Sequence, residues 1–208
     1  MAQLALDVTA FAAHLRAALP VGFEVALDLA LRDADAVAAG LDDALADADA
    51  LLERIWASVE TAVVNACADH ARAVKGVNAR YHLTGKPAPT EPSAYVADAA
   101  APLEAFDARW AAALDPERAR PWRSACTARA AEAYETLALD ALDHAAKFEE
   151  VMAKRGNADS LRADSRKIAL QLRLDLAAFD DATGCGAAAL SKASAAAEGV
   201  LARGGEGG

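Results

Sequence analysis

The feature that most constrains the fold is a long stripe of apolar residues between positions 41 and 77. Apolar side chains recur there at steps of four and three residues, which is the spacing of one face of an α-helix. The stripe comprises Leu41, Leu45, Ala48, Leu52, Ile55, Val59, Ala62 and Ala66, and it shifts at Asp69 to His70, Ala73 and Val77. One helix over 41–83 would be roughly 65 Å long. Such a helix favours an elongated bundle over a compact globule.

Composition extends the helical prediction to the whole chain. Alanine occupies 60 of the 208 positions, whereas the chain has only three Trp, three Tyr and five Phe. Alanine is the best helix former and fills the faces of a sheet poorly. We therefore predict an all-α protein with the architecture of an elongated antiparallel helical bundle.

Proline and glycine divide this bundle into segments. We expect N-terminal helices over 1–83, a Pro-rich loop over 84–92, a helical hairpin over 93–155, C-terminal helices over 156–203 and a disordered tail over 204–208. Pro87 and Pro89 exclude a helix in the loop, and Thr90 is expected to cap the helix that follows. Pro116 suits the first turn of the second hairpin helix. The polar stretch 155–164 is interpreted as another loop.

Residues 165–181 allow two interpretations. Ile168, Leu170 and Leu172 alternate with other residues at the period of a strand, but Leu, Gln, Arg and Ala favour a helix. We predict a helix with apolar residues on two faces. One face comprises Leu170, Leu174 and Ala177, and the other comprises Ile168, Leu172, Leu176 and Phe179. This second face is expected to be covered either by the alanine-rich helix that follows or by another subunit. We favour contact with a partner protein, because alanine side chains bury little area.

Charge and cysteine content exclude several classes of protein. The formal net charge of −10 argues against a nucleic-acid partner, which would need clustered Lys and Arg. No apolar run is long enough for a transmembrane span, and the start of the chain, with Asp7 and no basic segment, does not resemble a signal peptide. Cys67, Cys126 and Cys185 form no CxxC pair, so we expect three reduced thiols and a cytosolic protein.

The sequence offers no catalytic, cofactor-binding or metal-binding residues. A di-metal site in a helical bundle typically uses Glu-x-x-His pairs, and no histidine here follows a glutamate at that spacing. Phosphate-binding loops, dinucleotide fingerprints and nucleophile elbows are also absent from the sequence. Histidines and tryptophans are expected to pack or to face solvent: His14, His70, His82, His144, Trp56, Trp110 and Trp122. We therefore expect a protein that is not an enzyme.

Three groups of residues resemble a known family, in the same order. The first runs from Tyr81-His82-Leu83-Thr84 through Pro89-Thr90-Glu91-Pro92-Ser93-Ala94-Tyr95-Val96 to Pro102-Leu103. The second is Tyr134-Glu135-Thr136, and the third is Lys167-Ile168-Ala169-Leu170-Gln171-Leu172-Arg173-Leu174-Asp175-Leu176. Together they resemble the C-terminal domain of subunit 2 of the conserved oligomeric Golgi complex.

The resemblance implies a subunit of a vesicle-tethering complex on the cytosolic face of the Golgi membrane. Members of that family act in intra-Golgi retrograde transport and Golgi organisation through protein–protein contacts. The implied partners are the other subunits of the complex, in the lobe that contains subunits 1, 3 and 4, with peripheral membrane association through the complex. The implied fold is a rod-like helical bundle, and the resemblance carries over no catalytic residues and no cofactor.

Two other functions fit parts of the pattern. A generic helical-bundle or coiled-coil scaffold accounts for the apolar stripe, but not for the Pro-bounded loops. A ligand- or metal-binding helical-bundle enzyme would need polar groups that converge on an apolar face. The chain also departs from the family by lacking its long N-terminal coiled coil, so we expect a fragment, a truncated gene product or a divergent short form.

Overall fold

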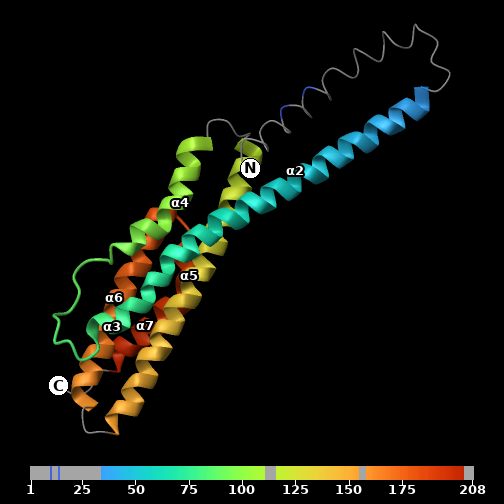
Figure 1. Ribbon diagram of the computed structural model, residues 1–208. Helices are drawn as coiled ribbons and strands as arrows, with labels where there is room; N and C mark the ends of the chain where they lie inside the picture. Colours follow the sequence, from blue (N-terminus) through green and yellow to red (C-terminus); the bar gives the residue numbers. More distant parts are fainter. Residues whose placement is uncertain (1–9, 11–13, 15–33, 111–115, 155–157, 204–208) are drawn as a thin grey trace. The chain divides into compact units, whose positions relative to one another are not determined.

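The described part of the chain is all-helical. The computed structural model describes residues 10, 14, 34–110, 116–154 and 158–203, and these form helices, turns and loops without a strand (Figure 1). The helices are α2 (Ala34–Ala71), α3 (Gly76–Tyr81), α4 (Tyr95–Trp110), α5 (Pro116–Ala153), α6 (Ala158–Thr183) and α7 (Ser191–Ala202), with short 3-10 turns at Arg72–Lys75 and Ala187–Leu190. The all-α prediction is confirmed. The expected helix near the N-terminus lies outside the described residues, apart from helical Ala10 and His14.

The chain divides into two compact units. The first comprises Met1–Ala62 with Ala112–Asp115, and its described part is the first portion of α2. Leu52, Ile55 and Val59 are buried there, as the apolar stripe predicts. The second comprises Val63–Ala111 and Pro116–Gly208 and contains all the other described helices.

Helix α6 is the centre of the second unit. It packs against α3, α4, α5 and α7, and α7 also packs against α5 (Figure 1). The core between these helices combines large side chains with many alanines; its largest fully buried members include Tyr81, Tyr134, Phe179, Ile168 and Leu172. Small residues at the contacts allow the helices to approach closely. The few aromatic rings fill the wider spaces that remain between the helices.

Helix boundaries differ from the predictions at three places. The expected continuous helix over 41–83 is interrupted, because α2 ends at Ala71 and a 3-10 turn precedes α3. The helix expected to start at Thr90 begins at Tyr95, because backbone groups before it bond to α6 instead. The loop expected over 155–164 is helical from Ala158 onward, where Leu161 is buried and continues the apolar face of α6.

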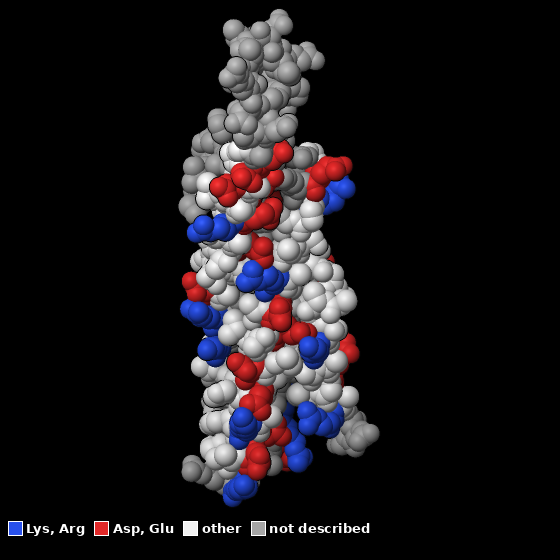
Figure 2. Space-filling model, turned by 90° about the vertical axis from the view of Figure 1, so that its right-hand side faces the viewer, with Lys and Arg blue, Asp and Glu red and all other residues white. Residues whose placement is uncertain are grey.

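Charged residues of both signs are interleaved on the surface. On the face shown in Figure 2, acidic and basic side chains alternate, without a continuous basic area. Several are paired with a residue three or four positions along the chain, such as Asp143 with Lys147 at 2.6 Å and Asp69 with Arg72 at 2.7 Å. Such exposed pairs contribute little to stability, so the energetically important polar groups are the buried ones.

Candidate functional site

The most buried polar group of the second unit is the carboxyl group of Asp175 on α6. It is 0% exposed and accepts three hydrogen bonds, from the backbone N–H of Ser93 at 2.6 Å, the hydroxyl of Tyr95 at 2.8 Å and the side-chain amide of Gln171 at 2.9 Å. The Tyr95 hydroxyl also lies 2.9 Å from the hydroxyl of Tyr134 on α5. Because Tyr95 donates its single proton to Asp175, Tyr134 is the donor in that second bond.

Gln171 connects the same cluster to α3 and to the loop that follows it. Its side-chain oxygen accepts a 2.7 Å hydrogen bond from the hydroxyl of Tyr81, the last residue of α3. Its side-chain nitrogen donates to the backbone oxygen of Glu91 at 2.9 Å and to Asp175. One buried amide therefore satisfies groups from α3, from the loop and from α6.

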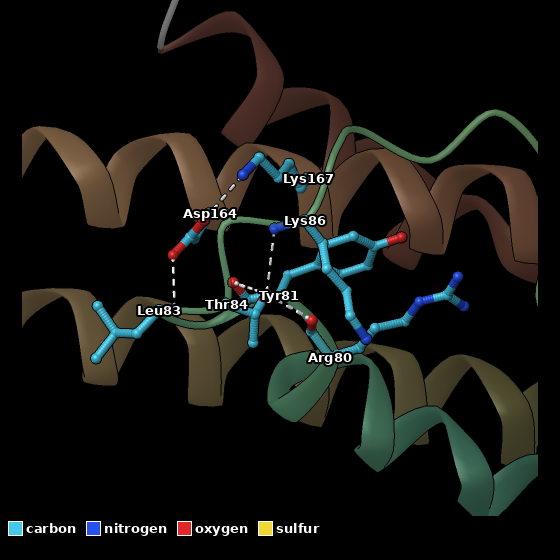
Figure 3. A network of polar contacts seen from close by, with 7 residues as sticks. All are labelled: Arg80, Tyr81, Leu83, Thr84, Lys86, Asp164 and Lys167. Atoms are coloured by element: carbon cyan, nitrogen blue, oxygen red, sulfur yellow. Dashed lines mark hydrogen bonds and ion pairs between the residues drawn. The ribbon is translucent and has the colours of Figure 1, made fainter.

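A second point of attachment holds the start of the loop. The backbone N–H of Leu83 donates to Asp164 at 2.8 Å, and Lys167 lies 3.1 Å from the other oxygen of that carboxylate (Figure 3). Leu83 has a φ of 55°, a left-handed conformation that is unfavourable for leucine and is held here by surrounding bonds. Because Asp164 and Asp175 lie about 16 Å apart along α6, the loop over 82–94 is fixed at both ends.

Helix α7 is held by another buried carboxylate. Glu135 on α5 is 8% exposed and accepts hydrogen bonds from the backbone N–H groups of Lys192 at 2.8 Å and Ala193 at 3.2 Å. The first N–H groups of a helix have no partner within the helix, and the helix dipole favours a negative charge beside them. Glu135 therefore determines where α7 begins on the surface of α5.

The two tyrosines beside Asp175 keep their protons at neutral pH. Burial is the largest cause that raises the pKa of Tyr95 and the pKa of Tyr134 well above the ordinary tyrosine value, and nearby Asp175 adds to both effects. Burial also raises the pKa of the Cys67 thiol to about 11. A hydroxyl or thiol that keeps its proton at neutral pH is a poor base and a poor nucleophile. The cluster is thus suited to holding helices together, and it lacks an activated group.

The candidate partner-contact residues lie in the core of the chain itself. Ile168, Leu172, Leu176 and Phe179 are 0%, 0%, 2% and 1% exposed, so the expectation that they face another protein is corrected. Leu170 and Leu174, on the other apolar face, are only partly buried. The physical reason is that α6 lies at the centre of the second unit. Helices α3, α4, α5 and α7 pack against it, so more of its circumference is covered than the single face that a surface helix buries.

The histidines do not come together in the described structure. His14, His70 and His144 are exposed, whereas His82 is half-buried and stacks on Phe148 with ring centroids 4.3 Å apart. Burial lowers the pKa of His82, and the negative charge of Asp164 opposes that shift. No group of three or more potential metal-ligating side chains occurs within the described residues.

The tryptophans occupy packing positions. Trp122 on α5 contacts Phe106 on α4, with ring centroids 4.2 Å apart. Trp56 and Trp110 are partly buried, the latter beneath the guanidinium of Arg109. Among the helices that the structure describes, none is both long enough and apolar enough to cross a lipid bilayer.

Sequence reasoning missed the polar residues that organise this cluster. Asp164, Gln171 and Asp175 are separated by seven and four residues, which places them on one side of α6, and all three are buried. In the sequence, polar residues that recur at helical spacing among leucines are the pattern that could have predicted this buried network. Glu135 lacked such a signal, because its partners lie 57 and 58 residues further along the chain.

The fold and the cluster define a class of protein, namely a helical bundle whose buried polar groups brace its own helices. The family model described as "COG complex component, COG2, C-terminal" matches residues 1–176. This chain belongs to that family of complex components.

The chain is also similar to a curated protein. The chain is similar to the conserved oligomeric Golgi complex subunit 2 of Dictyostelium discoideum, with 26% identity over 140 residues. The match covers 62% of this chain and 16% of that protein, so the chain spans about a sixth of the length of its relative. No solved structure matches the chain.

The three groups of residues that resemble the family meet in the buried cluster. Ser93 and Tyr95 belong to the first group, Tyr134 to the second, and Gln171 and Asp175 to the third. Residues about 40 to 80 positions apart in the sequence are therefore joined by one set of hydrogen bonds. The residues that resemble the family therefore have a structural role, because they fix the loop over 82–94 and the helices around α6.

Proposed function

We propose that this chain acts as the C-terminal domain of a Golgi vesicle-tethering subunit, through contacts with other proteins. In this role it joins the other subunits of the complex, in the lobe of subunits 1, 3 and 4, on the cytosolic face of the Golgi membrane. It acts in intra-Golgi retrograde transport and in Golgi organisation. It associates with the membrane peripherally, through the complex.

The observation that carries the proposal is the family match over residues 1–176. The structure supports it in a second way. The buried polar groups around Asp175 bond to one another and to the backbone, so they serve the fold. A bundle of this kind offers its outer surface for function, as expected for a protein that works by association.

Affinity purification from cells tests the proposal. The tagged chain is expressed in cells whose own copy of the subunit has been depleted, and co-purifying proteins are quantified by mass spectrometry. Enrichment of subunits 1, 3 and 4 is expected. The matched control is Leu172→Asp, which places a charge in the core and should unfold the second unit.

Two results would contradict the tethering role. A folded wild-type chain that enriches none of the tethering subunits would remove the basis for it. Self-association without any tethering subunit would favour the generic coiled-coil scaffold instead. Light scattering on the purified chain distinguishes self-association from a monomer.

A further inference from the structure

A groove opens where α7 ends on the surface of α5 and α6. It has a volume of about 600 Å³ and lies wholly within the second unit. Glu135 fixes the start of α7, and the 12 residues of α7 extend about 18 Å. The part of α5 that follows Glu135 extends about 27 Å, so α5 and α6 continue beyond α7 (Figure 1). Among the described residues, the groove therefore continues the path of α7 along α5 and α6.

The floor of the groove is apolar and consists mainly of small residues. Leu142, Ala146 and Ala153 lie on one side of α5 at helical spacing, and Val200 closes the end nearest α7. Leu142 is buried, but Ala146 is exposed. Small side chains allow the backbone of another element to approach closely, and α7 itself packs against α5 and α6 with Ala193 and Ala197 buried. A helix is thus the element that this surface fits.

The rim of the groove carries a positive balance of charge. Its charged lining residues are Arg162, Arg166, Arg203, Glu149 and Glu150. Both glutamates already have cationic neighbours, since Glu149 lies 3.9 Å from Arg162 and Glu150 lies 3.5 Å from Lys154. The lining itself has three arginines against two glutamates on a chain whose net charge is −10, and Arg162 also lies 3.7 Å from Asp159. Arginine also pairs well with carboxylates because its planar group can donate two parallel hydrogen bonds.

A buried hydroxyl group also lines the groove. Ser165 on α6 is 5% exposed, and its hydroxyl oxygen has no hydrogen-bond partner among the described residues. Buried polar side chains nearly always have a partner, because burial removes the water that would otherwise bond to them. Ser165 is therefore a polar side chain at the groove whose hydroxyl group the described residues leave without a hydrogen bond.

We propose that this groove binds an amphipathic helix of a partner protein, with small or medium apolar residues on one face and Asp or Glu along its flank. The helix continues the path of α7, its apolar face covers the floor, and its carboxylates lie beside Arg203 at the rim. Helix-in-groove recognition of this kind uses apolar anchors for affinity and flanking charges for selectivity. The inference rests on the proposed function, because it specifies the partner chemistry of a subunit that acts by association.

Two synthetic peptides provide the probes. Each is a helix of about four turns, of which about two turns can lie on the roughly 9 Å of α5 beyond α7. Each has a face of Leu and Ala, and the two differ only in having Glu or Lys along the flank. Fluorescence anisotropy with the full chain is expected to show about tenfold tighter binding of the Glu peptide at low salt. Arg203→Glu should reverse the preference, and the matched control Arg173→Glu, an exposed arginine outside the groove lining, should keep it.

A steric block tests the location. Ala146→Trp fills the floor, whereas Ala128→Trp places the same side chain at an exposed position of α5 outside the groove lining. Binding of the Glu peptide should be lost only in the first variant, with circular dichroism showing that both are folded. Equal binding of the two peptides, or unchanged binding to Ala146→Trp, would overturn the proposal.

Anionic vesicles identify the other possible ligand. If vesicles containing phosphoinositides bind through Arg203 and the Glu peptide does not bind, the groove is a lipid site and the proposal is wrong. These outcomes leave the tethering role intact as long as subunits 1, 3 and 4 still co-purify with the chain. Loss of those subunits from a chain that still binds the Glu peptide would contradict the tethering role alone.

Discussion

Replacing Asp175 with asparagine tests the buried cluster at its centre. Asparagine keeps the shape of the side chain, but only its oxygen accepts hydrogen bonds and its nitrogen donates them. The oxygen can retain the bonds from Ser93 and Gln171, which share one carboxylate oxygen in the native chain. The nitrogen then faces the hydroxyl of Tyr95, which donates to Asp175 in the native chain.

The resulting change passes along the row of hydroxyl groups. Tyr95 must turn to accept from the new amide, and its proton then points to Tyr134. The hydroxyl proton of Tyr134, whose side chain is 0% exposed, loses its acceptor. A buried donor without a partner costs about 1–3 kcal/mol, and the weakening of two charged bonds to neutral ones costs about 1 kcal/mol more. We expect Asp175→Asn to lower the free energy of unfolding by about 2–4 kcal/mol.

Urea denaturation followed by circular dichroism measures this loss. The matched control is Asp143→Asn, which removes an exposed carboxylate (57% exposed) and its ion pair with Lys147, and should cost less than about 0.5 kcal/mol. Tyr134→Phe provides a second check. In the native chain it should cost about 1 kcal/mol, because only the hydrogen bond from Tyr134 to Tyr95 is lost. In the Asp175→Asn variant it removes the unpartnered proton of Tyr134 but leaves the proton of Tyr95 without an acceptor, so it should again cost about 1 kcal/mol. An Asp175→Asn variant as stable as the native chain, or a Tyr134→Phe substitution that stabilises that variant, would refute this reasoning.

Three further predictions concern the core and the ionisable groups. Leu172→Ala should cost about 3 kcal/mol in urea denaturation, whereas Leu174→Ala, at a partly buried position, should cost about 1 kcal/mol; equal costs would contradict the assignment of the two faces. Burial places the pKa of His82 below its ordinary 6.5, so the unfolded chain binds a proton more readily than the folded chain does. The contribution of neutral His82 to the free energy of unfolding is therefore complete above pH 6.5 and is lost as the pH falls below that value. His82→Gln should reduce this acid sensitivity in thermal melts, and an unchanged profile would count against it. Because the pKa of Cys67 rises from 9.0 to about 11 in the folded chain, stability should fall between pH 9 and 11, and less so in Cys67→Ala.

Local patterns predicted the helices well because each helix carries its own apolar periodicity. Helix α5 (Pro116–Ala153) is the second helix of the hairpin expected over 93–155, since Pro116 suits a first turn and the apolar spacing continues without a break. The alternation of Ile168, Leu170 and Leu172 on α6 had two interpretations, and the helical one is confirmed. The elongated form of the bundle stays a prediction, which small-angle X-ray scattering would check.

Contacts between distant residues account for what the sequence did not reveal. The start of α4 depends on bonds from the loop to Gln171 and Asp175, which lie 80 and 82 residues beyond the loop groups they hold. Which apolar face of α6 is covered depends on the positions of α5 and α7, and both faces have similar composition. The groove at the end of α7 depends on the relative lengths of α5, α6 and α7, and no local sequence motif predicts how these lengths compare.

Reconstitution with purified components tests the central claim most directly. The chain is mixed with a separately purified assembly of subunits 1, 3 and 4, and binding is measured by analytical ultracentrifugation. The account predicts that the native chain sediments with the assembly and that the folded Ala146→Trp variant does so more weakly than Ala128→Trp. A native chain that is folded, binds none of these subunits and sediments alone at every concentration would contradict the account.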